Sequence, residues 1–283
     1  MFKKSQCFKF VCFILLLWRF VYKQNSDLAV STHFIKDSQI PKSFDNYKIV
    51  NISDLHNKTF GKNNIKLLDK IDELNPNIIV VTGDLINAYH PDRSLALNFI
   101  KKASKIAPLF YISGNHEVRL VNYELFKTKL INAGATVLSN DKIVIRQKEH
   151  SINLIGLDDP NFYPIENRYA IFNFIFDEIL DSVNPNDFTI LLSHRPELMD
   201  IYASKPLNLI LSGHAHGGQF RFPIIGGIFA PNQGFLPKYS SGKYSKLNTT
   251  MIVSRGLGPS SFPLRLNNKP DLVEVVLKVT KNR

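Results

Sequence analysis

Acidic, amide and imidazole side chains recur in this sequence directly after short apolar runs. The clearest case is Tyr111-Ile-Ser-Gly-Asn-His-Glu117, where an apolar run ends at Ser113-Gly114 and polar groups follow at once. A strand fixes such groups while the loop after it exposes them, as an active site requires. Four further runs end in the same way. Together these strand ends deliver Asp54, His56, Asp84, Asn115, His116, His194, His214 and His216.

The spacing of these residues is typical of metal ligands. Asp54 and His56 are two positions apart, as are His214 and His216, and along an extended chain such pairs turn to one side. Asp84 follows a glycine, which lets the backbone turn and approach closely. Mixed imidazole and carboxylate ligands favour manganese, iron or zinc over calcium. Manganese is the metal that we expect, with iron and zinc as alternatives.

The number of candidate ligands indicates a dinuclear centre. Without His116 there are seven, which is too many for one tetrahedral ion. A carboxylate such as that of Asp84 can bridge two cations, and two-metal sites clamp the attacking and leaving oxygens of a phosphoryl displacement. His116 directly follows a ligand, Asn115, and is therefore expected to protonate the leaving oxygen or to stabilise charge on the phosphoryl group. Taken singly, each residue is more typical of a surface or structural position, and their ordered recurrence is what favours a site.

Composition bounds the class of protein. The chain has 283 residues, a hydrophobic fraction of 44% and a net charge of +11, which allow one large α/β domain, or two small ones, with a real core. The charge indicates either a basic surface or attraction to anionic lipids or a phosphorylated substrate. Nothing resembles an RNA-binding signature, so we expect no nucleic-acid partner, and nothing implies a protein partner. Both cysteines, Cys7 and Cys12, precede the body, which excludes a disulfide framework and a thiolate metal site there.

The N-terminal segment, residues 1–24, is predicted to associate with a membrane. Its apolar run, residues 10–18, is bracketed by Lys9, Arg19 and Lys23 and is shorter than the roughly 20 apolar residues of a spanning helix. We interpret it as an uncleaved anchor whose basic residues reach the headgroups. The alternative is a cleaved signal peptide and a secreted protein. A slight excess of basic charge before the run places the catalytic domain outside the cytoplasm.

The rest of the chain divides into a tether, residues 25–46, with a first strand near residues 32–34, and a catalytic domain, residues 47–283. Early in this domain, continuous apolar strands alternate with amphipathic helices, which predicts an α/β sheet covered by helices. The expected helices are residues 62–74, 92–104, 121–133 and 168–180.

A second sheet is expected to begin near residue 142. Two short alternating runs separated by a polar turn indicate a hairpin and antiparallel pairing. Residues 217–243, rich in Gly, Pro and aromatic residues, are predicted to form a long loop. The later strands are expected at residues 188–194, 207–212, 249–254 and 272–279.

These residues carry a resemblance to a known family. The order and spacing of the motifs are similar to the complete set of calcineurin-like metallophosphoesterases. The motifs are Ser53-Asp-Leu-His56, Gly83-Asp84, Gly114-Asn-His-Glu117, Ser193-His194 and Gly213-His-Ala-His216. The resemblance implies a double β-sheet sandwich flanked by helices (αββα). It also implies site roles: Asp54, His56 and His216 on the first metal, Asn115, His194 and His214 on the second, Asp84 bridging, and His116 and Asp84 as the catalytic residues.

A narrower resemblance covers residues 45–277. Leu192-Ser-His-Arg-Pro-Glu197 and Gly213-His-Ala-His-Gly-Gly-Gln219 are similar to the YkuE/YaeI-type phosphodiesterase branch. So are Gly156-Leu-Asp-Asp-Pro160 and Ser254-Arg-Gly-Leu-Gly258, whereas Ala215 departs from the Thr or Ser that is frequent there. The branch typically carries an N-terminal membrane segment or export signal. Some relatives cleave the pyrophosphate of UDP-diacylglucosamine in lipid A synthesis.

The leading hypothesis is therefore a metal-dependent phosphodiesterase or pyrophosphatase that acts at a membrane surface on a phosphorylated, lipid-linked substrate such as UDP-diacylglucosamine. One alternative is an exported soluble nucleotide phosphodiesterase or phosphomonoesterase. Another is a non-catalytic protein-binding scaffold of the same fold, which the complete ligand set disfavours. Substrate contacts are expected from the loops at residues 86–91, 158–168 and 217–243.

Overall fold

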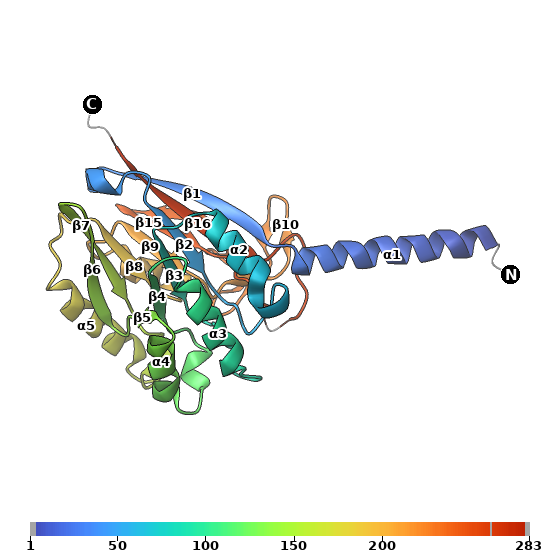
Figure 1. Ribbon diagram of the computed structural model, residues 1–283, viewed down its shortest axis with the longest axis horizontal. Coiled ribbons are helices and arrows are strands. Elements are labelled where there is room, and N and C mark those ends of the chain that lie inside the picture. Colours follow the sequence, from blue (N-terminus) through green and yellow to red (C-terminus); the bar gives the residue numbers. More distant parts are fainter. Residues whose placement is uncertain (1–3, 261, 281–283) are drawn as a thin grey trace.

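Two mixed β-sheets pack against each other between layers of helices in the computed structural model, which describes residues 4–260 and 262–280 (Figure 1). The first sheet has the order β1-β16-β2-β3-β4-β5, with bounds Ala29–Asp37, Asp271–Val279, Lys48–Ile52, Ile78–Thr82, Leu109–Ile112 and Ala135–Val137. The second has the order β14-β15-β9-β8-β7-β6, with bounds Gly242–Lys246, Thr249–Val253, Leu209–Ser212, Thr189–Leu192, His150–Gly156 and Asp141–Gln147. The predicted double-sheet α/β fold is confirmed.

Alternation along the strands explains both the layers and the continuous apolar runs. In β2, Ile49 packs in the core between the sheets, whereas Val50 packs under the helices of the first layer. In β8, Ile190 lies between the sheets and Leu191 lies under the second helical layer. Because both faces of these strands are buried, neither face has to be polar.

Helices form the two outer layers. The first sheet is covered by α2 (Ile65–Glu73), α3 (Arg93–Ala103) and α4 (Tyr123–Asn132), and the second by α5 (Arg168–Leu180), with the short α6 (Met199–Tyr202) beside it. The helix expected from residue 62 begins only at Ile65. Asn63 and Asn64 take left-handed φ values of 53° and 61°, and the Asn64 side chain accepts a hydrogen bond from the Phe60 backbone at 2.8 Å. Asparagine tolerates this backbone conformation, which stops the helix from starting earlier.

The carboxyl ends of the parallel strands meet at one edge. Strands β2, β3 and β4 run parallel in the first sheet, and β7, β8, β9 and β15 run parallel in the second. The loops after β2, β3, β4, β8 and β9 carry the candidate ligands. The topology therefore brings polar segments from across the chain to one end of the sandwich.

Most of the expected tether is part of the fold. Strand β1 pairs in parallel with β16 along its whole length, from Ala29 opposite Asp271 to Asp37 opposite Val279. The strand expected near residues 32–34 is thus the centre of a nine-residue edge strand. Its partner lies some 240 positions later in the chain, so local pattern alone underestimated its length.

The segment expected as a long loop contains two small hairpins. The first pairs β10 (Arg221–Phe222) with β11 (Gly226–Gly227), and the second pairs β12 (Phe229–Ala230) with β13 (Gly234–Phe235). Each ladder has only two residue pairs. Segments this short carry no period that a sequence pattern can reveal.

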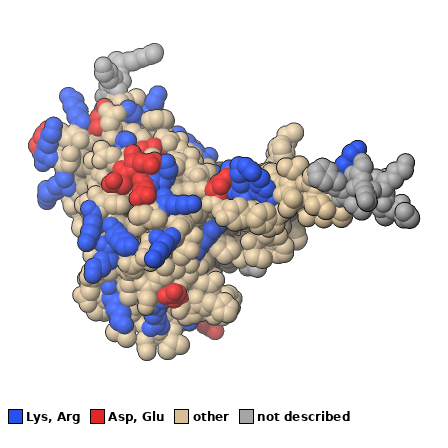
Figure 2. Space-filling view, turned by 45° about the vertical axis from the view of Figure 1, so that its right-hand side comes forward, with Lys and Arg blue, Asp and Glu red and all other residues tan. Residues whose placement is uncertain are grey.

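Helix α1 (Lys4–Ser26) extends away from the body (Figure 1). Consecutive apolar side chains from Phe13 to Trp18 are exposed. Within residues 4–260 and 262–280, no helix combines the length and apolarity needed to cross a membrane. Figure 2 shows a face on which Lys and Arg predominate over Asp and Glu, while the described part of α1 is mostly uncharged.

Candidate metal centre

The loops after the strands hold their polar residues in an unusual backbone conformation. Asp54, His56, Asp84, His214 and His216 all have φ between 47° and 64°, in the left-handed region. The expectation that an extended chain turns each pair to one side is therefore wrong. Tight turns, not strand alternation, aim these side chains. Non-glycine residues pay conformational energy in this region, and such strain is concentrated at functional sites.

Two glycines allow the loops after β3 and β4 to touch. A Cβ on Gly83 would lie 2.7 Å from both the Gly114 Cα and the His194 Nδ1. A Cβ on Gly114 would collide with the Asp84 carboxylate. Since real Cβ atoms do not approach other atoms so closely, these positions require glycine for the ligand loops to meet.

A first cluster joins the loops after β2 and β9. The Nε2 atoms of His56 and His216 are 3.2 Å apart, and His216 Nε2 lies 3.4 Å from Asp54 Oδ1. Donor atoms from all three residues lie within 4.8 Å of one another, and all three residues are buried. Burial lowers the pKa of His56 to about 3 and that of His216 well below its usual value. The imidazoles therefore offer neutral nitrogen lone pairs to a cation.

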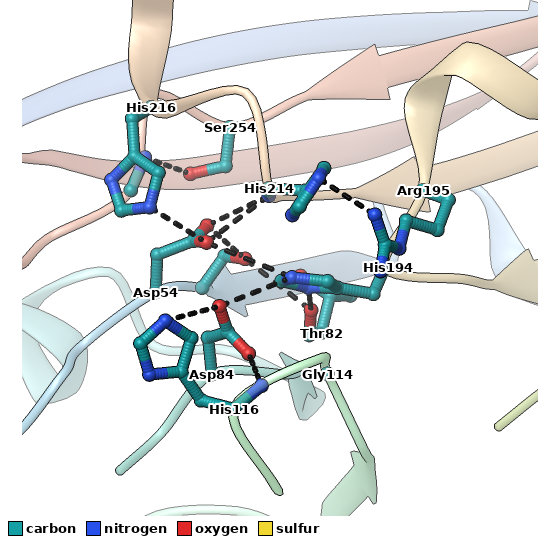
Figure 3. Close-up of polar contacts among 12 residues, drawn as sticks. Asp54, Thr82, Asp84, Gly114, His116, His194, Arg195, His214, His216 and Ser254 are labelled. Carbon is teal, nitrogen blue, oxygen red and sulfur yellow. Dashed lines mark hydrogen bonds and ion pairs between the residues drawn. The ribbon is translucent and has the colours of Figure 1, made fainter. Parts of the chain in front are cut away.

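A second cluster joins the loops after β3, β8 and β9 (Figure 3). His194 Nε2 lies 3.3 Å from Asp84 Oδ2, and His214 completes the group. The same Asp84 oxygen lies 3.6 Å from His56 Nε2, so this carboxylate stands between the two clusters. Asn115 Oδ1 is buried and has no hydrogen-bond partner in the part of the chain that the structure describes.

The protonation of His194 and Asp54 also fits a cation site. Burial lowers the pKa of His194, but the Asp84 and Asp54 carboxylates outweigh it and raise that pKa to about 10. Burial raises the pKa of Asp54 to about 6. The buried carboxylates of Asp54 and Asp84 thus favour the protonated form of His194. A divalent cation would compete with that proton for the lone pair on the ring nitrogen. His194 Nδ1 contacts the Thr82 carbonyl at 2.7 Å, which leaves Nε2 for the cluster.

His116 faces the site from the loop after β4. Its Nδ1 accepts a hydrogen bond from the Ala88 backbone at 3.0 Å, so a neutral ring carries its proton on Nε2. That Nε2 lies 3.9 Å from Asp84 Oδ2, and His116 lines the cavity. Distance alone also groups His116 with His56 and Asp84 as a possible ligand. Its hydrogen bond nevertheless leaves an N–H, not a lone pair, facing inward.

Glu117 ties two of the ligand loops together, and the sequence analysis assigned it no role. Its fully buried carboxylate accepts hydrogen bonds from the backbones of Gly114 at 2.8 Å, Asp84 at 2.9 Å and Ile86 at 3.3 Å. Burial, with the nearby Asp84, raises the pKa of Glu117 to about 7. The sequence feature that could have indicated this role is that Glu117 directly follows Asn115 and His116.

Arg195 is a second contributor that sequence reasoning missed. It forms a two-pronged ion pair with Asp159, at 2.5 Å from Nε and 3.0 Å from Nη2. Its Nη1 lies 2.9 Å from His214 Nε2 and donates to Asn232 Oδ1 at 2.7 Å. Asn232 Oδ1 also lies 2.9 Å from His214 Nε2, so this ring nitrogen faces away from the cluster, which leaves Nδ1 for it. The signal was the position of Arg195 directly after His194.

A cavity of about 760 Å³ opens over these groups. Its lining includes arginines from three segments, Arg119, Arg168 and Arg195, together with Tyr89. Arg119 donates a hydrogen bond to the Tyr89 hydroxyl at 2.6 Å. The cavity therefore contains the Asp and His residues that could bind cations, together with the guanidinium groups of the lining arginines. This arrangement suits an anionic ligand.

The structure brings all eight sequence-predicted residues to this one edge, and the donor set fits metal ions. The buried Asn115 Oδ1 has no hydrogen-bond partner among the described residues, which is otherwise an unexplained cost to the fold. Carboxylate, amide and imidazole donors without thiolates suit first-row divalent metals.

Comparison with known proteins agrees with this geometry. Residues 47–218 match the model of the calcineurin-like phosphoesterase family. The metallophosphoesterase YkuE of Bacillus subtilis is 32% identical over 92% of this chain and 88% of its own. A metallophosphoesterase of Aquifex aeolicus is 28% identical over 93% of this chain and 97% of its own. The phosphodiesterase YaeI of Escherichia coli is 28% identical over 86% of this chain and 85% of its own.

The chain belongs to the calcineurin-like phosphoesterase family and is a phosphoric ester hydrolase. Its Asp and His clusters, taken with the family, indicate a dinuclear divalent metal centre. The alternative of a non-catalytic protein-binding scaffold is therefore not supported, because every expected ligand position carries a residue that can bind a metal.

Proposed function

We propose that this protein hydrolyses a phosphodiester or pyrophosphate bond in a lipid-linked substrate at a membrane surface, with UDP-diacylglucosamine as one example of the class. The observation that carries the substrate class is the cavity lining: three arginines line the cavity that also contains the cluster. A single phosphomonoester is neutralised largely by two divalent cations. Additional guanidinium groups suit a substrate with a second phosphate, which arginine recognises through paired hydrogen bonds.

We assign the ligands by their clusters. Asp54, His56 and His216 would hold one metal, and Asn115, His194 and His214 the other. Asp84 would bridge them, because its Oδ2 faces both groups. Manganese is the metal that we propose, with iron or zinc as substitutes. When bound, two such ions polarise the phosphoryl oxygens and acidify water.

The chain's own residues supply orientation and a proton. The His116 Nε2–H faces the cavity and is placed to donate to the leaving oxygen. Arg195 is held rigid by Asp159, so it presents its remaining N–H groups at a fixed position beside His214. Arg119 and Arg168 would contact the more distant phosphate.

Membrane association is proposed to come from α1, whose apolar side chains from Phe13 to Trp18 are exposed and which is flanked by Lys9, Arg19 and Lys23. Such a helix gains free energy by placing these side chains among lipid chains and its basic residues among headgroups. We place the catalytic domain on the outer face of that membrane.

A substrate panel tests the proposal. The full chain in mild detergent, loaded with Mn²⁺, Fe²⁺ or Zn²⁺, is given phosphomonoesters, soluble phosphodiesters, nucleotides and nucleotide-diphosphate lipids. We expect the diphosphate lipid to have the highest kcat/KM. A preference for soluble nucleotides or phosphomonoesters would instead support the soluble exported enzyme. Full turnover by protein with no measurable metal would refute metal dependence.

A further inference from the structure

A set of exposed apolar side chains lies on or next to the two small hairpins and on the segment at residue 262. It consists of Phe222, Ile224, Ile225, Phe235, Leu236 and Phe262, hereafter the apolar rim. These side chains are between 45% and 107% exposed. Exposed apolar residues that stand singly need no explanation, but several on neighbouring loops mark an interaction surface.

Ile224, between β10 and β11, has both an unusual backbone conformation and a fully exposed side chain. Ile224 is 107% exposed and has a φ of 72°, in the left-handed region. A β-branched residue is strained there, and a glycine would relieve the strain. The side chain thus costs conformational energy and is fully exposed among the described residues. Packing within the described chain therefore does not account for an isoleucine at this position, which makes it a candidate for a contact outside the chain.

Hydrogen bonds join the segments that carry Phe222 and Phe262 to the base of α1. The Asn25 side chain, at the end of α1, accepts from the Arg265 backbone N–H at 2.8 Å and donates to its carbonyl at 3.3 Å. Next to it, the Arg221 N–H donates to the Leu266 carbonyl at 3.0 Å, which fixes the first hairpin to the same segment. The rings of Phe220 and Phe262 are 5.4 Å apart. In Figure 1, β10 lies beside the end of α1 at which the helix joins the body.

The rim also borders the candidate active site. Pro231 and Asn232, in the turn between β12 and β13, line the cavity over the metal cluster. Pro259 and Ser260, shortly before Phe262, line it as well. The same loops therefore carry apolar side chains outward and cavity-lining residues inward.

We infer that the apolar rim inserts into the lipid bilayer beside α1 and holds the mouth of the cavity at the headgroup level. This rests on the proposed membrane function and extends it from α1 to the catalytic body. A bilayer is the partner that fits, because α1 is exposed on all sides from Phe13 to Trp18, whereas a second protein would cover one stripe.

Basic side chains lie at the base of α1. Lys58 donates to the Asn25 carbonyl, and Lys269 forms an ion pair with Asp27 at 3.2 Å, so both ammonium groups are already engaged by the protein. Lys23 is in the last turn of the helix. Basic side chains at this level, next to inserted apolar ones, are typical of peripheral attachment to an anionic membrane. Figure 2 shows Lys and Arg side chains, with an acidic side chain beside them, near the place where α1 leaves the body.

An environment-sensitive dye at a single cysteine tests the insertion directly. The background is the full chain with Cys7→Ala and Cys12→Ala, and the dye is placed at Ile225→Cys. The matched control is Leu247→Cys, because Leu247 is 79% exposed and precedes the amino end of β15, opposite the metal site. Vesicles contain phosphatidylcholine with about one-fifth phosphatidylglycerol, and a second batch carries brominated acyl chains.

We expect the dye at position 225 to shift to the blue on vesicle addition and to lose at least half of its emission to the brominated lipid. The dye at position 247 should change by less than one-tenth. If both positions stay in water while the protein floats with the vesicles, α1 alone binds and the rim inference is wrong. If the protein does not float at all, membrane attachment by both elements is wrong.

Activity measurements on vesicle-embedded and soluble substrates distinguish insertion of the rim from the proposed reaction. In Ile224→Ser/Ile225→Ser, the kcat/KM for a vesicle-embedded diphosphate lipid should fall roughly tenfold, because two large apolar side chains no longer enter the bilayer. The kcat/KM for a small soluble phosphodiester should stay within twofold of wild type, and Leu247→Ser should behave like wild type on both. Equal activity of the double variant on vesicles would overturn the inference and leave the phosphodiesterase assignment intact.

Discussion

His116 differs from the other histidines of the cluster in what its ring offers the cavity. The Ala88 N–H occupies its Nδ1, so an N–H points inward, whereas the Thr82 carbonyl occupies the Nδ1 of His194 and leaves a lone pair. A donor suits a leaving oxygen, and a lone pair suits a metal. The two rings therefore perform different tasks within the same pocket.

Replacement of His116 by alanine should separate catalysis from metal binding. We expect kcat to fall by roughly 10²–10⁴-fold, the usual contribution of a general acid, while metal content stays near that of wild type. Asp84→Ala should lose metal and activity together, because Asp84 Oδ2 faces both clusters. Metal analysis alongside steady-state kinetics makes the comparison. Equal metal loss in both variants would place His116 among the ligands.

Glu117 is expected to position the ligand loops. Glu117→Gln keeps the shape but turns an amide NH₂ toward backbone N–H donors of Asp84, Gly114 or Ile86. We expect metal affinity to fall by about 10–100-fold, as is usual when a group supporting metal ligands is lost. The readout is a metal titration by calorimetry, with activity recovering at saturating Mn²⁺. Glu124→Gln, on an exposed side chain, is the control; unchanged affinity in Glu117→Gln would remove the positioning role.

At the scale of elements, the hydrogen bonds that join α1 to the body within the described residues come from its last turn. The contacts of Asn25 with Arg265 and Lys58 lie beyond residue 24, and the sheet begins at Ala29. The paired strands and both cores therefore do not include the exposed part of the helix. The body should fold without it.

Removal of residues 1–24 should leave a soluble, metal-loaded enzyme. Activity on a small chromogenic phosphodiester should be unchanged, because that substrate reaches the cavity from water. Activity on a vesicle-embedded lipid should fall, because anchoring raises the local enzyme concentration, and the loss should be greater at high salt. Insolubility, or lost activity on the small ester, would make the segment part of the fold. A full-length protein recovered with a new N-terminus past Lys23 would identify a cleaved signal instead.

At the scale of the whole molecule, the metal site is expected to control stability. Two carboxylates and several imidazoles are buried at the junction of the two sheets, where unpaired charge is costly. Cations bound there would offset this cost and would hold together loops from both halves of the sandwich.

Chelation should therefore lower the melting temperature, and Mn²⁺ should restore it. A ligand at about one hundred times its dissociation constant stabilises the folded state by about 2.7 kcal/mol. Scanning calorimetry of the apo protein with added Mn²⁺, and with Ca²⁺ as the control, measures this effect. Ca²⁺ should recover less, because nitrogen-rich sites disfavour it. An unchanged transition on complete metal removal would show that no metal supports the fold.

Several features were determined by the sequence alone. The apolar runs from residue 47 onward have both faces buried, so their composition already indicated a sheet covered on each side. The polar residues stand at the strand ends, and Asp54, Asp84, Asn115 and His194 could be named because neighbouring positions in the chain specify them. Local order and periodicity are enough for such features, since they depend on short-range geometry.

The remaining features were decided by contacts between distant parts of the chain. The length of β1 depends on β16, and the position of Asp84 between two clusters depends on the approach of Gly83 to Gly114. The clamp of Asp159 on Arg195, and the left-handed turn at Asp54, are likewise set by packing. No local pattern encodes these arrangements. Their free energy comes from groups that become neighbours only when the two sheets have formed.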